Sequence, residues 1–364
     1  MSSRTDRLRV GVVGINNRIR RVILGGLAAS PRAVVTAVCS RSVEKAAAVA
    51  RELGTAEPFA DYQQMVDDGP IDAVFVETPA ELHYPMVMAA IAAGKHVACE
   101  KPLATSVAEA VEMERAAREA GVRTAVNFTY RSGTAHRYFA EVLAGGEIGE
   151  LLHFEVGYWQ ARQLLPQTPV KGALDDIGPH ALDLLRWWAQ AAGAGEVEAL
   201  CSLEGGRPDL PSNRQPTWHA LARLTGGATG AIQASRVAAG YSNAATAAFH
   251  GRMGALSLQF DVEEGVVALA RVGKGRPEGR WTPLQIPPEL VVSFEEFPAF
   301  HLDRIVGALR GEEAFPGFAD GVRVQQMQEA AAASAAEGRW VTVKSARPGG
   351  RDRADFTRAH PDGA

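Results

Sequence analysis

Short apolar runs alternate with helical stretches along the first third of the chain. The apolar runs are rich in Val, Ala, Ile and Phe, and they are Arg9–Val13, Ala33–Cys39, Ile71–Val76, His96–Cys99 and Thr124–Phe128. Helical patterns fill the intervals, at Arg18–Ala29, Glu44–Leu53, Asp61–Asp67, Tyr84–Ala93 and Ser106–Ala120. Near-continuous apolar strands between helices predict a parallel sheet covered on both faces. We therefore expect an α/β domain of the doubly wound Rossmann type over residues 1–127, with ligands at the carboxyl ends of its strands.

The hydrophobic pattern changes after about residue 128. From residue 197 to 267, short β-rich runs alternate with Gly-rich turns, which predicts an open, mostly antiparallel sheet. The helices expected around it are Ala135–Leu143, Asp176–Gln190, Phe300–Leu309 and Gly321–Ala336, with a strand at Leu151–Tyr158. We expect an α+β domain for substrate binding and oligomerisation over residues 128–345, and a flexible Arg-, Asp-, Gly- and Pro-rich tail over 346–364.

Composition narrows the possible partners. A chain of 364 residues suits two domains, and its 46% hydrophobic and 22% charged residues are ordinary for a globular protein. A net charge of −4 gives no bulk support for nucleic-acid binding. No apolar stretch reaches the roughly 18 residues that span a membrane, and the start lacks a signal-peptide core. Three scattered cysteines favour neither disulfides nor a metal site. We expect a cytoplasmic protein with no metal, nucleic-acid or membrane partner.

The first strand-to-helix turn is poor in glycine. A dinucleotide-binding turn normally reads Gly-x-Gly-x-x-Gly, and here Gly14 is followed by Asn16 and Ile19 at the other two glycine positions. Asn tolerates the left-handed backbone conformation better than most residues, so the turn can form. We predict cofactor contacts from Gly14, Asn16, Asn17 and Arg18.

The end of the second strand bears on the choice of cofactor. NAD-binding proteins usually have an acidic residue there for the ribose 2′-hydroxyl, whereas a 2′-phosphate favours a nearby Arg. This chain has Ser40 and Arg41, and its first carboxylate is Glu44. A hydroxyl and a guanidinium suit a phosphate, so the sequence favours NADP(H) over NAD(H). The alternative is a solvated turn with a surface Arg.

Thr78, Pro79 and His83 follow the third long apolar run. Thr78-Pro79 predicts a rigid turn near the nicotinamide ribose, and we include both residues among the cofactor contacts. His83 either contacts the ligand or has a structural role at the start of a helix. Glu77, which precedes this turn, is unusual at the end of a buried strand.

Two separated stretches carry residues suited to proton transfer. Glu100-Lys101-Pro102 ends a buried strand, and Asp176 precedes His180 by four residues, one helical turn. Loss of a hydride from a carbinol carbon requires loss of the hydroxyl proton to a group with a pKa near the working pH, and His180 starts close to that value. The alternatives are a surface lysine, a helix cap and a histidine satisfied in the core.

The joint presence of these motifs resembles the glucose–fructose oxidoreductase, inositol dehydrogenase and rhizopine-catabolism family, Gfo/Idh/MocA. The matching segments are T-P-A-E-L-H at 78–83, A-G-K-H-V-A-C-E-K-P-L-A at 93–104 and G-A-L-D-D-I-G-P-H-A-L-D at 172–183. The resemblance implies an active site between the two domains and frequent homodimers or homotetramers. It assigns catalysis to Lys101, Asp176 and His180, and places Glu100 and Lys101 beside the cofactor.

We therefore expect an NADP(H)-dependent dehydrogenase or reductase that interconverts a secondary alcohol and a ketone on a sugar, a cyclitol or a related small polar metabolite. One alternative retains the cofactor tightly and achieves net hydrolysis, elimination or epimerisation. Another is a non-catalytic family member whose glycine-poor turn impairs cofactor binding.

Overall fold

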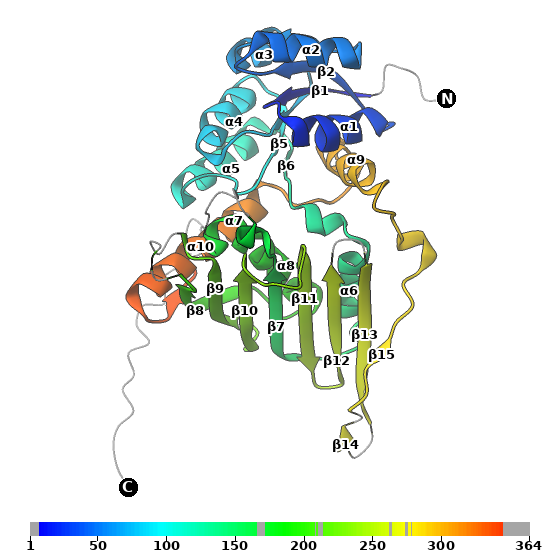
Figure 1. Cartoon of the computed structure of the whole chain (residues 1–364), viewed down its shortest axis with the longest axis vertical. Coiled ribbons are helices and arrows are strands. Elements are labelled where there is room, and N and C mark those ends of the chain that lie inside the picture. The colour runs from blue at the N-terminus through cyan, green and yellow to red at the C-terminus, as the bar shows by residue number, and fades with distance from the viewer. Residues whose placement is uncertain are drawn as a thin grey trace.

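The chain folds into an α/β part above a broad sheet (Figure 1). The computed structural model describes residues 7–165, 172–207, 209, 214–261, 264–273, 276–277 and 279–344. The tail expected over residues 346–364 lies outside these described residues.

The N-terminal sheet has six parallel strands in the order β3-β2-β1-β4-β5-β6. Their bounds are β1 Leu8–Val13, β2 Ala33–Cys39, β3 Glu57–Phe59, β4 Ala73–Val76, β5 His96–Cys99 and β6 Thr124–Val126. This order confirms the predicted Rossmann fold, in which the chain reverses its direction of winding between β1 and β4. No strand was predicted at β3, which is a short edge strand with a proline at its centre.

Helices cover both faces of this sheet. They are η2 Ile19–Leu24, α1 Gly25–Ala29, α2 Val43–Leu53, α3 Tyr62–Asp68, η3 Ala80–Leu82, α4 His83–Ala92 and α5 Val107–Ala120. A late helix, α9 (Phe297–Arg310), returns to pack against α1. Gly26 makes this approach possible, because a Cβ there would lie 2.7 Å from the Pro298 carbonyl oxygen.

The second sheet has ten strands in the order β14-β13-β12-β11-β7-β10-β9-β8-β16, with β15 beside β13. Among the described strands of this second sheet, only β7 and β10 pair in parallel. The expected open, mostly antiparallel sheet is therefore confirmed. The strands are β7 Leu151–Trp159, β8 Val197–Gly205, β9 Thr217–Leu224, β10 Thr229–Ser235, β11 Ala244–Gly251, β12 Gly254–Asp261, β13 Glu264–Gly273, β14 Arg276–Pro277, β15 Thr282–Pro283 and β16 Val341–Thr342.

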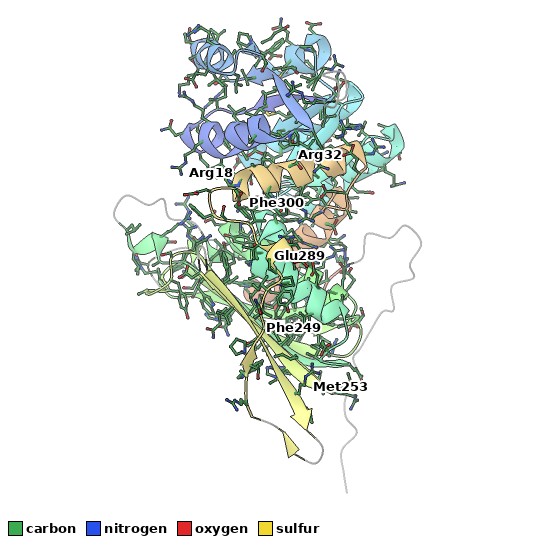
Figure 2. All side chains as sticks on the ribbon, turned by 90° about the vertical axis from the view of Figure 1, so that its right-hand side faces the viewer. Arg18, Arg32, Phe249, Met253, Glu289 and Phe300 are labelled. Carbon is green, nitrogen blue, oxygen red and sulfur yellow. The ribbon has the colours of Figure 1, made fainter. Side chains whose placement is uncertain are left out.

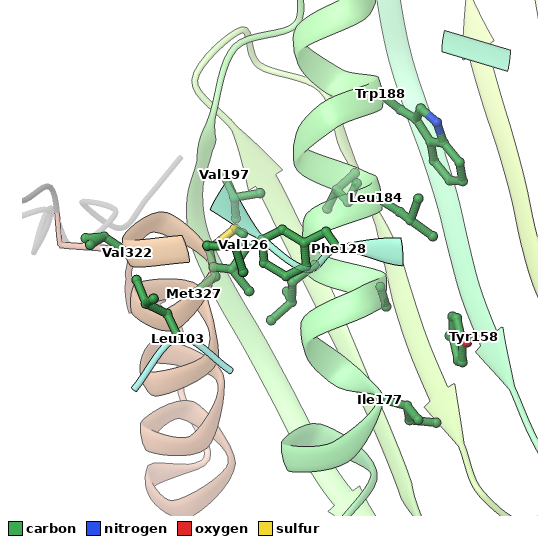
Figure 3. Close-up of a cluster of buried hydrophobic side chains, with 14 of the residues drawn as sticks. Leu103, Val126, Phe128, Tyr158, Ile177, Leu184, Trp188, Val197, Val322 and Met327 are labelled. Carbon is green, nitrogen blue, oxygen red and sulfur yellow. The ribbon is translucent and has the colours of Figure 1, made fainter. Parts of the chain in front are cut away.

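One face of the second sheet supports α6 (Thr134–Ala144), α8 (Gly178–Ala191) and α10 (Phe318–Glu337). Their apolar side chains form one continuous core with the N-terminal domain, which includes Leu103, Phe128, Trp188, Val322 and Met327 (Figure 3). On β8 and β9, the outward side chains Leu203 and Leu221 are exposed. The expected homodimer or homotetramer stays a prediction.

The segment that carries Asp176 and His180 is broken into two helices, so the single helix expected from Asp176 to Gln190 is wrong. The first is α7 (Ala173–Asp176), and α8 begins at Gly178 after a break at Ile177. Pro179 has no N–H to continue the hydrogen bonding of α7, and proline is well suited to the first turn of a new helix.

Candidate functional site

The turn after β1 requires its glycine. Gly14 has φ +98°, a left-handed conformation, and a Cβ at this position would lie 2.5 Å from the Glu77 carbonyl oxygen. No other residue fits so close to the neighbouring strand end. The backbone at the switch between β1 and β4 is therefore shaped as a dinucleotide-binding turn at its first glycine position.

Asn16 has a structural task at the second glycine position. Its Oδ1 accepts a hydrogen bond from the Ile19 N–H at 3.0 Å, and it therefore caps the first helix. Asn16, Asn17 and Arg18 are exposed, whereas Ile19 is 1% exposed and fills the core where a third glycine would stand. The turn replaces glycine flexibility with a side-chain cap and presents polar groups to solvent.

Ser40 and Arg41 lie between β2 and α2, at an N-terminal helix end. Ser42 Oγ accepts from the Lys45 N–H at 3.3 Å and donates to Glu44 at 2.7 Å, so the first carboxylate after β2 is bound to the helix cap. Ser40 is half-buried and Arg41 is exposed. A hydroxyl, a guanidinium and a helix N-terminus together suit an anion.

His83 contacts the two loops that follow β4 and β5. Its Nδ1 lies 2.9 Å from the Pro102 carbonyl oxygen and its Nε2 lies 2.9 Å from the Thr78 carbonyl oxygen. The imidazole is 1% exposed, so its geometry fits the structural interpretation rather than direct ligand contact. Thr78 is half-buried and Pro79 is exposed beside it.

Glu100 is the centre of a buried polar network at the end of β5. Its carboxylate accepts from Arg18 at 3.1 Å, from the Asn127 amide at 3.0 Å and from the Lys101 N–H at 3.1 Å. The network continues from Asn127 Oδ1 to His301 of α9 at 2.7 Å. The cofactor turn, the lysine loop and α9 are thus joined through one carboxylate.

Glu77 adds a second carboxyl group beside Glu100. It is 6% exposed, and its Oε2 has no hydrogen-bond partner among the described residues. Burial, and then the charge of Glu100, raise the pKa of Glu77 well above its ordinary value. The unusual strand-end acid noted in the sequence is therefore a neutral carboxylic acid over a wider pH range than a free glutamate.

Replacement of Glu77 by Gln should flatten the pH dependence of stability. A raised pKa means that the folded state binds the proton more tightly, so the stabilisation is complete below about pH 4.3 and is lost as pH rises towards the folded-state pKa. Glu77→Gln carries no such proton. Urea unfolding between pH 5 and 8 should show the variant gaining on the parent, by at most about 1.4 kcal/mol per pH unit.

Glu81 is an exposed glutamate four residues later, in η3, and Glu81→Gln is the matched control. The pH dependence of its stability should follow that of the parent protein. Parallel profiles for the parent and Glu77→Gln would refute the buried neutral acid.

Lys101 reaches across the domain junction. Its Nζ donates to the Asp176 carbonyl oxygen at 2.6 Å, and the Lys101–Pro102 peptide bond is cis. The Asp176 carboxylate forms an ion pair with Arg236, whose side chain is 4% exposed. The structure therefore brings Lys101 and Asp176 together. It also pairs the Asp176 carboxylate with Arg236, which no sequence motif had indicated.

His180 is packed between two tyrosines. Its ring lies 4.9 Å from the Tyr130 ring, edge to face, and 5.5 Å from the Tyr158 ring, stacked. Burial lowers the pKa of His180 well below its ordinary value, and the positive charges of Lys101 and Arg18 lower it further. The imidazole is therefore neutral at physiological pH, and its pKa lies further below the working pH than the sequence led us to expect, so it is a weaker base than a free histidine.

The two tyrosines belong to a hydrogen-bonded cluster that includes Asn243. The Tyr158 hydroxyl donates to Asn243 Oδ1 at 2.9 Å and also contacts the Tyr130 hydroxyl. The Asn243 amide donates to the Tyr130 hydroxyl at 2.5 Å. Tyr158 is fully buried. The sequence analysis did not identify Arg236, which follows β10, or Asn243, which precedes β11, because neither lies in a local motif.

Two features are absent from the described residues. No helix in the described ranges is long and apolar enough to cross a membrane. No cluster of three or more His, Cys, Asp or Glu within those ranges could hold a metal ion.

Two family models match the chain. An oxidoreductase model with an NAD-binding Rossmann fold matches residues 8–128, and the GFO/IDH/MocA C-terminal domain matches residues 136–257. Levoglucosan dehydrogenase of Pseudarthrobacter phenanthrenivorans is 29% identical over 84% of this chain and 88% of its own. The 1,5-anhydro-D-fructose reductase of Ensifer adhaerens is 37% identical, and that match spans 49% of this chain and 56% of the reductase.

A solved structure of levoglucosan dehydrogenase with NADH and levoglucosan superposes with a TM-score of 0.79. It is 26% identical, and the match covers 93% of this chain and all of the other. The two family models match the N-terminal and the C-terminal domain in this order. The chain therefore belongs to the Gfo/Idh/MocA family of oxidoreductases.

Proposed function

We propose that this protein is an NADP(H)-dependent oxidoreductase that interconverts a secondary alcohol and a ketone on a sugar, a cyclitol or a related polar metabolite. The observation that carries the proposal is the junction of Lys101 with Asp176 beside the neutral His180. The lysine comes from the carboxyl end of β5, and the other two residues come from the α7–α8 segment of the second domain.

The residues at the strand ends fit a dinucleotide. The close approach at Gly14 leaves no room for a Cβ, and Glu77 presents a buried carboxyl oxygen without a partner among the described residues. We assign the pyrophosphate region to Gly14, Asn16, Asn17 and Arg18. The 2′-phosphate is assigned to Ser40 and Arg41, and the nicotinamide end to the loops of Thr78, Pro79 and Glu100. A bound nicotinamide would accept or donate the hydride.

The protein's own groups handle the proton. A neutral His180 can accept the hydroxyl proton of the substrate during oxidation and return it during reduction. The Lys101 ammonium stabilises negative charge that develops on the same oxygen. Arg236 holds the Asp176 carboxylate, so Asp176 is positioned to keep Lys101 in place through its carbonyl oxygen.

The relatives support a sugar-like substrate and leave the cofactor to be tested. Levoglucosan dehydrogenase and 1,5-anhydro-D-fructose reductase are both named for compact sugar derivatives. The levoglucosan dehydrogenase complex contains NADH, which makes NAD(H) the alternative cofactor. The Ser40-Arg41 pair, with Glu44 bound to its own helix cap, is what favours NADP(H) here.

Replacement of Arg41 by Ala should weaken NADPH binding and spare NADH binding. Loss of a charge-assisted hydrogen bond to a phosphate costs about 1.5–3 kcal/mol, or roughly a tenfold to hundredfold change in Kd. Titration followed by cofactor fluorescence measures both constants. Arg51→Ala, an exposed arginine at the far end of α2, is the control and should change neither.

Equal weakening of NADPH and NADH by Arg41→Ala would refute the 2′-phosphate assignment alone. If the parent binds neither cofactor at near-millimolar concentration, the proposed oxidoreductase activity is wrong.

A further inference from the structure

A large cavity adjoins the Tyr130 cluster. Its volume is about 780 Å³, and it lies between α6, the ends of β11 to β13, and the segment that leads from the second sheet to α9. Figure 2 shows this segment, with Glu289, rising from the sheet towards Phe300 of α9. Much of the wall is hydrocarbon, contributed by Leu165, Phe260, Ile286, Val292, Phe294 and Phe297.

The mouth of this cavity is surrounded by exposed apolar side chains. Leu165 is 62% exposed, Tyr241 42%, Val291 57% and Phe294 60%. A single exposed apolar residue is ordinary, but four that converge on one hollow from three separate segments indicate a binding surface.

Hydrogen-bonding groups concentrate at one end of the cavity. Tyr130 and Asn243 line it and bond to each other at 2.5 Å, and Arg162 lies in the same wall. Because the Tyr130 ring is 4.9 Å from the His180 ring, this polar end borders the proposed catalytic residues. A ligand that reaches His180 would therefore extend from a polar region into an apolar one.

His136 keeps the apolar part of the cavity free of charge. Neither of its ring nitrogens has a hydrogen-bond partner among the described residues, and the side chain is fully buried. Burial lowers the pKa of His136 to about 3, so the imidazole is neutral. Its ring packs 4.7 Å from Phe260 and presents an aromatic surface rather than an ion.

We infer that the substrate is a sugar-like ring that carries an apolar aryl or alkyl substituent, and that the cavity beyond Tyr130 binds this substituent. This inference rests on the proposed function and deepens it. Pockets of about 300–1,000 Å³ hold drug-sized ligands, so 780 Å³ exceeds what one sugar ring requires. A free monosaccharide would leave most of the hydrocarbon wall in contact with water.

A small apolar group accounts for the cavity better than a macromolecular surface does. The hollow is concave, and Tyr130, which lines it together with Asn243 and Arg162, also contacts the His180 ring. Those features match a ligand whose orientation is fixed at one end and whose affinity comes from apolar burial at the other.

The test compares matched pairs of glycosides that differ only in the substituent. Calorimetry would measure the binding of methyl and phenyl β-D-glucopyranosides, and of the corresponding galactopyranosides, to the NADPH-loaded protein. We expect the phenyl member to bind at least tenfold more tightly. Phe294→Ser, at an exposed position that should not affect folding, should reduce this ratio several-fold, while Leu221→Ser on the open sheet face should leave it unchanged.

A second measurement does not depend on the correct sugar or on turnover. The neutral dye N-phenyl-1-naphthylamine should fluoresce on binding to the parent protein, less with Phe294→Ser, and should be displaced by phenyl but not methyl glucosides. Equal affinity for both members of every pair, no binding of any, or dye fluorescence that falls as the protein self-associates would overturn the inference. Intact binding of NADPH or NADH in that case preserves the proposed function, whereas failure of the parent protein to bind either cofactor refutes the function itself.

Discussion

Replacement of Lys101 by Met should reduce turnover by about a hundredfold to a thousandfold, the range expected when a group that stabilises charge on the reacting oxygen is lost. Met keeps the length of the side chain but removes the ammonium that bonds to Asp176 and faces His180. Steady-state kinetics, with NADPH consumption followed by absorbance, measures kcat. Cofactor affinity, measured by fluorescence, should change less than the rate because the turn at Gly14 and the Ser40-Arg41 pair remain.

Lys95 supplies a matched control at the other end of the same strand. Its Nζ donates to the Ile71 carbonyl oxygen at 3.0 Å, so both lysines bond to a backbone carbonyl of another segment. Only Lys101 stands at the carboxyl end of β5, beside the second domain. Lys95→Met should retain turnover, and similar losses in the two variants would show that the effect of Lys101 is structural.

The N-terminal fold could be predicted because its strands are buried on both faces. Such strands read as continuous apolar runs, and the helices between them are ended by glycines, as at Gly94 and Gly121. β3 could not be predicted, because three residues at an edge have too little pattern to detect. The packing of α9 onto α1 was also invisible, since it depends on a close backbone approach between Gly26 and Pro298.

The site was partly predictable for a similar reason. Lys101, Asp176 and His180 belong to local motifs, and the structure joins Lys101 to Asp176 directly. Arg236 lies 60 residues after Asp176, and only the pairing of β10 within the sheet brings it there. Sequence patterns report secondary structure and short motifs, whereas partners delivered by sheet topology carry no signal in a single sequence.

The glycine-poor turn shows a different limit of sequence reasoning. Compared with the Gly-x-Gly-x-x-Gly pattern, Asn16 and Ile19 each replace a glycine that a dinucleotide-binding turn normally has. In the structure, Asn16 caps the helix through the Ile19 N–H, and Ile19 belongs to the core. The turn has therefore exchanged one set of stabilising features for another while keeping the one glycine that the neighbouring strand requires, Gly14.

Replacement of Asp183 by Ala should destabilise the protein by about 3–5 kcal/mol, because it leaves a buried arginine without a counter-charge. Asp183 accepts two hydrogen bonds from Arg131, at 2.8 and 2.7 Å, and their side chains are only 2% and 10% exposed. The Arg131 guanidinium also lies 4.8 Å from the centre of the Trp187 ring. Urea unfolding measures the loss, and turnover should fall too because Arg131 follows Tyr130 in η4 (Thr129–Ser132).

An exposed ion pair gives the comparison that isolates burial as the cause. Arg115 and Glu119 lie 2.7 Å apart on α5 with side chains 51% and 56% exposed, so Glu119→Ala should cost at most about 1 kcal/mol. The double replacement Arg131→Met with Asp183→Leu should recover most of the stability, since it leaves neither charge stranded. Two outcomes would contradict this prediction. Asp183→Ala could lower the free energy of unfolding no more than Glu119→Ala does, or the double variant could be no more stable than Asp183→Ala. Either result would show that the buried Arg131–Asp183 pair does not stabilise the packing of η4 against α8.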